Sequence, residues 1–169
     1  MGVLTSPPKL PAGLKELSCE LCTQLMSLPD GLDRLFCYGC VQLKSLPTLH
    51  SSLTYLGCSS CTQFCTLPEL PAGLTYIGLS NTQLASLPEL PSGLVYIECA
   101  GCNRLLLLPK FPCGLKYLSC GICSQHVSLP ELPDGLTELR CRGLESLATL
   151  QKLPSGLVDL WRYNCTQLT

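Results

Sequence analysis

Five pairs of cysteines, each with two residues between its members, recur along the chain. The pairs occur in "SCELC", "FCYGC", "GCSSC", "ECAGC" and "SCGIC". Cysteines at this spacing can supply two of the four ligands of a structural zinc ion, or form a redox dithiol at a helix start. They can also be core residues, because a thiol outside a disulfide behaves as a small hydrophobic side chain.

The elements that would position these cysteines form a tandem repeat. One leucine recurs at intervals of 18 to 21 residues and marks eight units. The eight anchor residues are Leu14, Leu32, Leu53, Leu74, Leu94, Leu115, Leu136 and Leu157. These units account for residues 1–169, so a single repeat domain is predicted.

Within each unit, the residue pattern is typical of a short strand. Leucine or isoleucine stands three residues after every anchor, and cysteine stands five and eight residues after most anchors. Positions three and five share one face of a strand, because successive side chains point to opposite faces. The unit at Leu74 has Leu79 and Thr82 in the two cysteine positions, which indicates core positions. Twelve of the fourteen cysteines should therefore point inward, whereas Cys65 and Cys113 fall outside both columns.

This arrangement argues against metal and redox chemistry. Each cysteine pair follows one strand and its exit turn, so the thiols should form two parallel columns instead of a tetrahedral cluster. The sequence has no helical periodicity, so we expect no helix N-terminus that would lower the pKa of a thiol. We therefore expect no cofactor, and a cysteine-rich metal-binding or redox protein is the alternative interpretation. Because cysteines on adjacent units are close enough for disulfides, a reducing, cytoplasmic compartment is predicted.

The segments that return from one unit to the next contain twelve of the fourteen prolines. Proline fixes φ and lacks an N–H donor, so the convex side should be extended or polyproline-like, with few or no helices. Residues that tolerate left-handed backbone stand seven residues after several anchors, at Gly39, Asn81, Gly101, Gly143 and Asn164. The predicted fold is a solenoid whose concave face is a sheet of short parallel strands.

The outward side of these strands is the candidate binding surface. The second residue after the anchor is tyrosine in four consecutive units, and small residues between the rings should leave a shallow trough. Acidic residues Glu16 and Glu20 lie near one end and Arg140 and Arg142 near the other, so the face should be polarised. The predicted partner-binding residues are Tyr38, Tyr55, Tyr76, Tyr96, Tyr117, Arg140, Arg142, Trp161 and Tyr163.

Two explanations of the tyrosines compete at this point. Exposed aromatic stripes are uncommon on monomers, and tyrosine and tryptophan are frequent anchors of protein interfaces. Identical rings on neighbouring strands can also stack on one another and stabilise the sheet without binding anything.

Composition and motifs favour a non-enzymatic module whose partner is another protein. The 11 basic and 12 acidic side chains nearly balance, which does not favour a nucleic-acid partner. No apolar run approaches the ~20 residues of a membrane-spanning helix, and no signal peptide is evident. No phosphate-binding glycine loop or nucleophile elbow is found. The last unit leaves an unpaired edge, which predicts end-to-end self-association or a flanking segment.

The run L-P-x-L-P-x-G-L-x-x-L-x-C-x-x-C-x-x-L resembles the bacterial LPX-type leucine-rich repeats of type III secreted effectors and some secreted ubiquitin ligases. The resemblance covers residues 10 to 168 and departs from the family where cysteines replace the usual apolar residue and Asn. No cysteine is followed by x-Asp, the nucleophile motif of the ligase relatives. The resemblance therefore implies an effector-like recognition module without a ligase domain, acting in the host cytoplasm if it is secreted.

Overall fold

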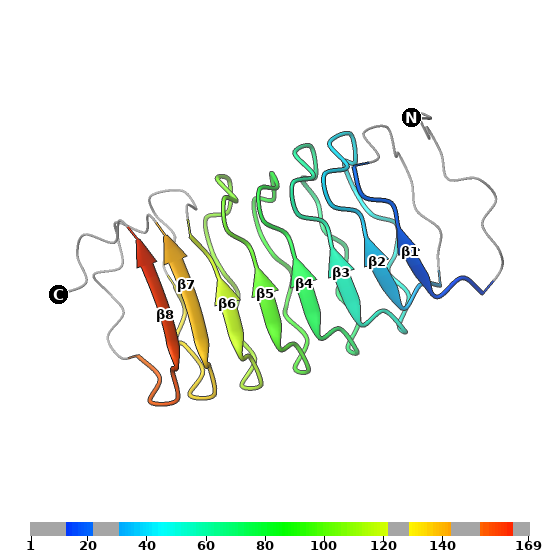
Figure 1. Ribbon diagram of the computed structural model, residues 1–169. Helices are drawn as coiled ribbons and strands as arrows, with labels where there is room; N and C mark the ends of the chain where they lie inside the picture. Colours follow the sequence, from blue (N-terminus) through cyan, green and yellow to red (C-terminus); the bar gives the residue numbers. More distant parts are fainter. Residues whose placement is uncertain (1–12, 22–30, 122–128, 143–152, 164–169) are drawn as a thin grey trace.

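The fold is a single row of short parallel strands, with the first strand on the right and the last on the left of Figure 1. The computed structural model describes residues 13–21, 31–121, 129–142 and 153–163. The strands are β1 (Glu16–Ser18), β2 (Arg34–Phe36), β3 (Tyr55–Gly57), β4 (Tyr76–Gly78), β5 (Tyr96–Glu98), β6 (Tyr117–Ser119), β7 (Glu138–Arg142) and β8 (Asp159–Tyr163). They form one sheet in the order β1 to β8. No helix occurs in the described ranges. The predicted leucine-rich-repeat solenoid is confirmed.

Every strand begins two residues after an anchor leucine, so the sheet register follows the repeat. Leu35 pairs with Leu56, and Ile77 pairs with Ile97. Tyr76 of β4 likewise lies between Tyr55 and Tyr96 on its two neighbours. Equivalent positions therefore stack into columns that run across the strands, which gives any residue type repeated at one position a neighbour of its own kind.

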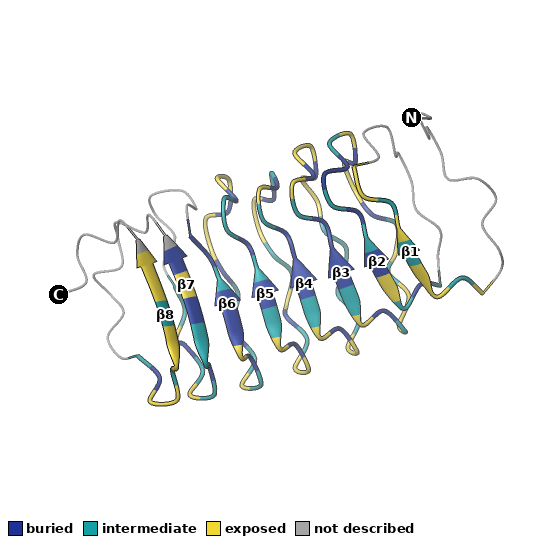
Figure 2. Cartoon of the chain, viewed as in Figure 1, coloured by how far each residue is buried: buried dark blue, intermediate teal, exposed yellow. Residues whose placement is uncertain are grey.

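The core lies between the sheet and the return segments. The residues three after the anchors are fully or nearly fully buried in β2 to β7, and Phe64 on the return side is the largest fully buried side chain. Figure 2 shows that burial is greatest in the central strands, whereas β8 is mostly exposed. Apolar burial therefore holds the central units together more strongly than the last described one.

The cysteines of the repeat fill this core, as predicted. Those five residues after an anchor are fully buried at Cys37, Cys58, Cys99, Cys120 and Cys141. Cys19, also five residues after its anchor, is partly buried, and those eight residues after an anchor are fully buried at Cys40, Cys61 and Cys102. Cys22, Cys123 and Cys165 lie outside the described residues. Cys65 and Cys113 are exposed, so the inward and outward sets are separated as the repeat predicts.

The position eight residues after an anchor selects a small hydrogen-bond donor. The thiol of Cys61 donates to the carbonyl oxygen of Cys37 at 2.9 Å, and that of Cys102 donates to Leu79 at 3.2 Å. In both cases the acceptor belongs to the preceding unit. Thr82 occupies the same position and donates its hydroxyl to Leu79 at 2.8 Å. Cysteine and threonine both fit this position because each is a small side chain that donates to a carbonyl oxygen, which belongs to the preceding unit for these two cysteines and to its own unit for Thr82.

The turns that follow strands β1 to β5 have left-handed backbone at one position. The φ angles are 69° at Gly39, 58° at Asn81 and 73° at Gly101, as predicted. The same position has φ of 57° at Leu21 and 62° at Ser60, although neither residue type favours it. The coil geometry therefore imposes this conformation on whichever residue follows the strand. Gly143 and Asn164 lie outside the described residues.

No helix in the part of the chain that the structure describes is long and apolar enough to cross a membrane.

Candidate functional site

Four tyrosine rings form a continuous stack across strands β3 to β6, here called the tyrosine stack (Tyr55, Tyr76, Tyr96 and Tyr117). The ring centroids of Tyr55 and Tyr76 are 4.0 Å apart with planes 4° from parallel. Tyr76 and Tyr96 are 4.7 Å apart, and Tyr96 and Tyr117 are 3.8 Å apart. These separations are those of direct ring packing, so each inner ring has both of its faces covered by neighbours.

An arginine closes the tyrosine stack at each end. The Arg34 guanidinium carbon lies 5.3 Å from the Tyr55 ring centroid, and that of Arg140 lies 5.3 Å from the Tyr117 centroid. Both arginines are paired with carboxylates, Arg34 with Glu16 at 3.1 Å and Arg140 with Glu138 at 2.6 Å. Cations over ring faces are attracted by the π electrons. Each end of the stack thus carries one arginine paired with one glutamate.

A carboxylate that the sequence prediction missed organises the hydroxyl groups. Tyr76 and Tyr96 each donate a hydrogen bond of 3.2 Å to Glu98, one to each carboxylate oxygen. Glu98 stands four residues after its anchor, where the neighbouring strands have Gly78 and Ser119. The signal in the sequence was a charged residue at a position where both neighbouring strands have a small residue. A single carboxylate thus fixes two rings of the stack.

Tyr38 lies against the same stack from the next outward position. Its hydroxyl is 2.6 Å from that of Tyr55, and its ring lies 6.4 Å from that of Phe36. A Cβ added to Gly57 would overlap the Tyr38 ring, so this ring can cross β3 only because residue 57 is glycine. Phe36 in turn lies 4.5 Å from Tyr55. Tyr38 and Phe36 therefore extend the aromatic surface over β2 and β3.

The stack is less exposed than a ladder of outward-facing rings should be. Tyr117 is only 6% exposed, which contradicts its prediction as a solvent-facing residue. Tyr55, Tyr76 and Tyr96 are half-buried. The reason is mutual coverage, because each ring lies on the next and Arg140 covers the outer face of Tyr117. Ring edges and hydroxyl groups, instead of ring faces, form the outer surface of the stack.

The surroundings of Tyr38, Tyr76 and Tyr96 favour the protonated form of their hydroxyl groups. Burial raises the pKa of Tyr76 above its ordinary range, and hydrogen bonds with neighbouring hydroxyls and the charge of Glu98 raise it further. Burial, hydrogen bonding with Tyr117 and the charge of Glu98 raise the pKa of Tyr96. Burial also raises the pKa of Tyr38. A raised pKa is the reverse of what a nucleophilic or basic tyrosine needs.

A hollow of about 800 Å³ lies beside the stack, toward the carboxyl ends of the strands. Its floor consists of small residues, among them Ala100, Gly101, Ser119 and Gly121, and we call this site the concave hollow. The hollow shares Ala100, Ser119 and Gly121 with the predicted trough but lies beside the tyrosine rings instead of between them, and large side chains of β7 and β8 border it. The remaining lining residues are Asn81, Asn103, Arg140, Cys141, Leu160, Trp161 and Arg162.

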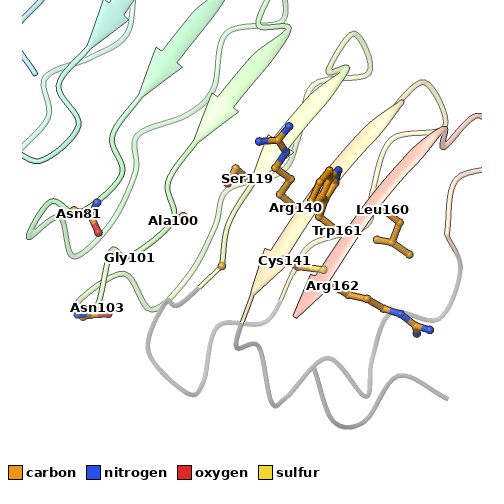
Figure 3. Close-up of a pocket in the computed structure, with 11 residues that line it drawn as sticks. Asn81, Ala100, Gly101, Asn103, Ser119, Arg140, Cys141, Leu160, Trp161 and Arg162 are labelled. Carbon is orange, nitrogen blue, oxygen red and sulfur yellow. The ribbon is translucent and has the colours of Figure 1, made fainter. Parts of the chain in front are cut away.

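Arg140 and Trp161 stand side by side at the wall of the concave hollow (Figure 3). The Arg140 guanidinium carbon is 5.4 Å from the Trp161 ring centroid. Trp161 is 63% exposed, the largest exposure of any described aromatic side chain on this face. Arg142 and Tyr163 pair with each other in register at the ends of β7 and β8, and their side chains lie outside the described residues.

No group of three or more potential metal ligands occurs within the described ranges, and the alternative of a metal-binding protein gains no support from them. The Sγ atoms of Cys37 and Cys58 lie 3.2 Å apart. The hydrogen bond to Cys58 and burial raise the pKa of Cys37, which opposes the thiolate form that metal binding needs.

The parallel solenoid, with its repeated strands and helix-free return segments, defines a leucine-rich-repeat fold. The structure is similar to that of YopM from Yersinia enterocolitica WA-314, with a TM-score of 0.67 and 25% sequence identity. The similarity covers 94% of this chain and 40% of YopM, so the chain spans less than half of that protein. No family description and no curated protein matches the sequence. A leucine-rich-repeat fold is typical of non-enzymatic protein-interaction scaffolds.

Proposed function

We propose that this protein is an effector-like, non-enzymatic module that binds a protein partner on its concave face. The observation that carries the proposal is the concave hollow, which places the exposed Trp161 over a floor of small residues. An accessible tryptophan beside an open, largely apolar hollow has the composition of an interface anchor point. Repeat solenoids commonly use this face, because it offers an extended surface of fixed curvature.

The tyrosine stack serves this site as a platform. Its ring faces are covered by neighbouring rings, and two of its hydroxyls are bound by Glu98. Such a surface loses little side-chain freedom on binding, which lowers the entropic cost of association. Tyr38, Tyr55, Tyr76, Tyr96 and Tyr117 therefore contribute a rigid border, and the partner's principal side chain enters the hollow.

The core supports the proposal of a reducing compartment. Cys37 and Cys58 are buried thiols whose sulfur atoms lie 3.2 Å apart, and an oxidising compartment would favour joining them. The nearly balanced charge of 11 basic and 12 acidic residues supports a protein partner over a nucleic acid.

Site-specific photo-crosslinking tests which face binds. A photoreactive residue placed at Asn103, on the rim of the hollow, is compared with one at Glu89, an exposed convex position. Crosslinked adducts with the partner protein are expected from position 103 and not from position 89, and Trp161→Ala should abolish the adducts from position 103. Val158→Ala is the matched control, because Val158 is 79% exposed and does not line the hollow. Adducts from position 89 alone, or adducts indifferent to Trp161→Ala, would refute the proposal.

A further inference from the structure

We propose that the occupant of the concave hollow is an acidic segment of the partner protein that carries an aromatic or large apolar side chain next to the acidic one. This inference rests on the proposed function and adds the chemistry of the ligand. It follows from the charged residues of the lining, from the fixed orientation of the Arg140 guanidinium and from the exposure of the Trp161 indole.

The charged residues that line the concave hollow are two arginines, Arg140 and Arg162, and no carboxylate is among its lining residues. Arg162 stands five residues after its anchor and points away from Trp161, so Arg140 is the cation beside the indole (Figure 3). The groove on the convex side has the opposite character, because Glu69, Glu89, Glu131 and Asp134 line it with Lys110 as the single cation. With a net charge of −1, the chain as a whole has no positive excess. The cation beside Trp161 is thus a local feature, and the edge of it that Glu138 does not engage favours a negatively charged ligand.

Arg140 is held in one orientation before any ligand arrives. Its Nε donates to Oε1 of Glu138 at 2.8 Å, and Nη2 lies 2.6 Å from the same oxygen. Aromatic rings lie at 5.3 Å and 5.4 Å from its guanidinium carbon, those of Tyr117 and Trp161. Nη1 has no partner among the described residues, so the outer edge of the planar group keeps its donors. That edge matches the two oxygens of a carboxylate.

Trp161 supplies the second half of the recognition. Arg140 occupies one side of its ring, and the side chain is still 63% exposed. The floor beside it contains Ser119 and Gly121, which leave room for a ring or a branched apolar side chain. The amide side chains of Asn81 and Asn103 lie on the rim and can bond the backbone of an extended segment.

Arg34 provides a matched control at the other end of the stack. It has the same kinds of contact as Arg140, with its guanidinium carbon 5.0 Å from Phe36 and 5.3 Å from Tyr55, and it pairs with Glu16. It does not line the concave hollow. A role confined to stabilising the aromatic stack would affect both arginines alike, whereas ligand binding would involve Arg140 alone.

The test uses the whole chain and a phage library of random peptides. Selection on wild type should enrich peptides with Asp or Glu next to Trp, Phe, Tyr or Leu. Fluorescence anisotropy then compares an enriched peptide with its Asn and Gln counterpart, which should bind about 10-fold more weakly or worse. Arg140→Gln should weaken the acidic peptide by about 10-fold, and Arg34→Gln by less than about two-fold. Arg140→Lys keeps the charge without the fork and should bind more weakly than wild type.

Several results would overturn the inference. They are enrichment of basic or neutral peptides, no enrichment, equal binding of acid and amide peptides, and equal losses in the Arg34 and Arg140 variants. The photo-crosslinking experiment separates this failure from failure of the proposed function. If adducts from position 103 need Trp161 but persist in Arg140→Gln, the concave face binds proteins and the acidic chemistry is wrong.

Discussion

The concave face contains two aromatic regions that differ in what covers their rings. In the tyrosine stack, adjacent ring centroids lie 3.8 Å to 4.7 Å apart, and Tyr117 is 6% exposed. At the concave hollow, Trp161 is 63% exposed. Both regions occupy outward positions of the same repeated coil. The difference teaches that an aromatic residue repeated on successive strands is covered by its own kind, whereas one that appears where the repeat changes stays exposed.

The two regions also differ in how much they contribute to folding stability. Stacked rings with bound hydroxyls contribute to folding stability, because their contacts exist without any ligand. An exposed indole and the free edge of a fixed guanidinium contribute little until a ligand covers them. The four predictions below run from the largest expected effect on stability to the smallest.

Removal of an inner ring of the tyrosine stack should cause the largest loss of folding stability. Tyr96→Ala removes contacts with Tyr76 and Tyr117 and the hydrogen bond to Glu98. The free energy of unfolding should fall by about 2–4 kcal/mol, from two ring pairs and the lost apolar burial. Equilibrium denaturation in urea measures this change. A loss below about 0.5 kcal/mol would mean that the stack is not structural and would remove the contrast between the two regions.

Alkaline pH should destabilise the chain partly through the stack. The pKa values of Tyr76 and Tyr96 are raised above the ordinary 10.0. Their contribution is therefore complete below about pH 10 and is lost as the pH rises, by at most ~1.4 kcal/mol per pH unit for each group. Unfolding free energies between about pH 8 and 11 should fall less steeply above pH 10 in Tyr76→Phe, because phenylalanine does not titrate.

Buried thiols add a second alkaline loss that begins earlier. The hydrogen bond to Cys58 and burial raise the pKa of Cys37 from 9.0, so its contribution is lost as the pH rises above about 9. Wild type and Tyr76→Phe share this loss of stability, so it does not affect the comparison between them. Trp161→Phe serves as the control variant at the concave hollow. Identical pH profiles in wild type and Tyr76→Phe would contradict the assignment to the stack.

Neutralising Glu98 should have a moderate effect. Glu98→Gln weakens two charge-assisted hydrogen bonds at a half-buried site and should cost about 1 kcal/mol. It also removes a negative charge that raises the pKa of Tyr76 and Tyr96, so their ionisation should shift to lower pH. Tyrosinate absorption detects the shift. Glu89→Gln, on the convex side, is the control and should change neither quantity.

Trp161→Ala should have the smallest effect on stability. Trp161 is 63% exposed, so its loss should change the free energy of unfolding by less than about 0.5 kcal/mol. Binding of a selected peptide or a crosslinked partner should nevertheless fall by about 10-fold or more, since aromatic anchors carry much of an interface's energy. A large loss of stability with unchanged binding would place Trp161 with the stack instead of the hollow.

Much of this arrangement could be predicted from the repeat. The anchor spacing determined the parallel strands and the columns, because a residue's position in the coil follows from its distance to the anchor. The inward cysteines at Cys58 and Cys61 and the left-handed turns at Asn81 and Gly101 were predictable for the same local reason. The outward position of the tyrosines also followed from strand alternation.

The sequence by itself determined which positions share a column, and the tertiary structure decided how far each side chain reaches across neighbouring columns. The burial of Tyr117 under Arg140, the capture of two hydroxyls by Glu98 and the hollow beside Trp161 all depend on that reach. Alternation specifies only the face to which a side chain points. Whether a long side chain lies over the next strand depends on its rotamer and on the size of the neighbour, and both are set by packing between units.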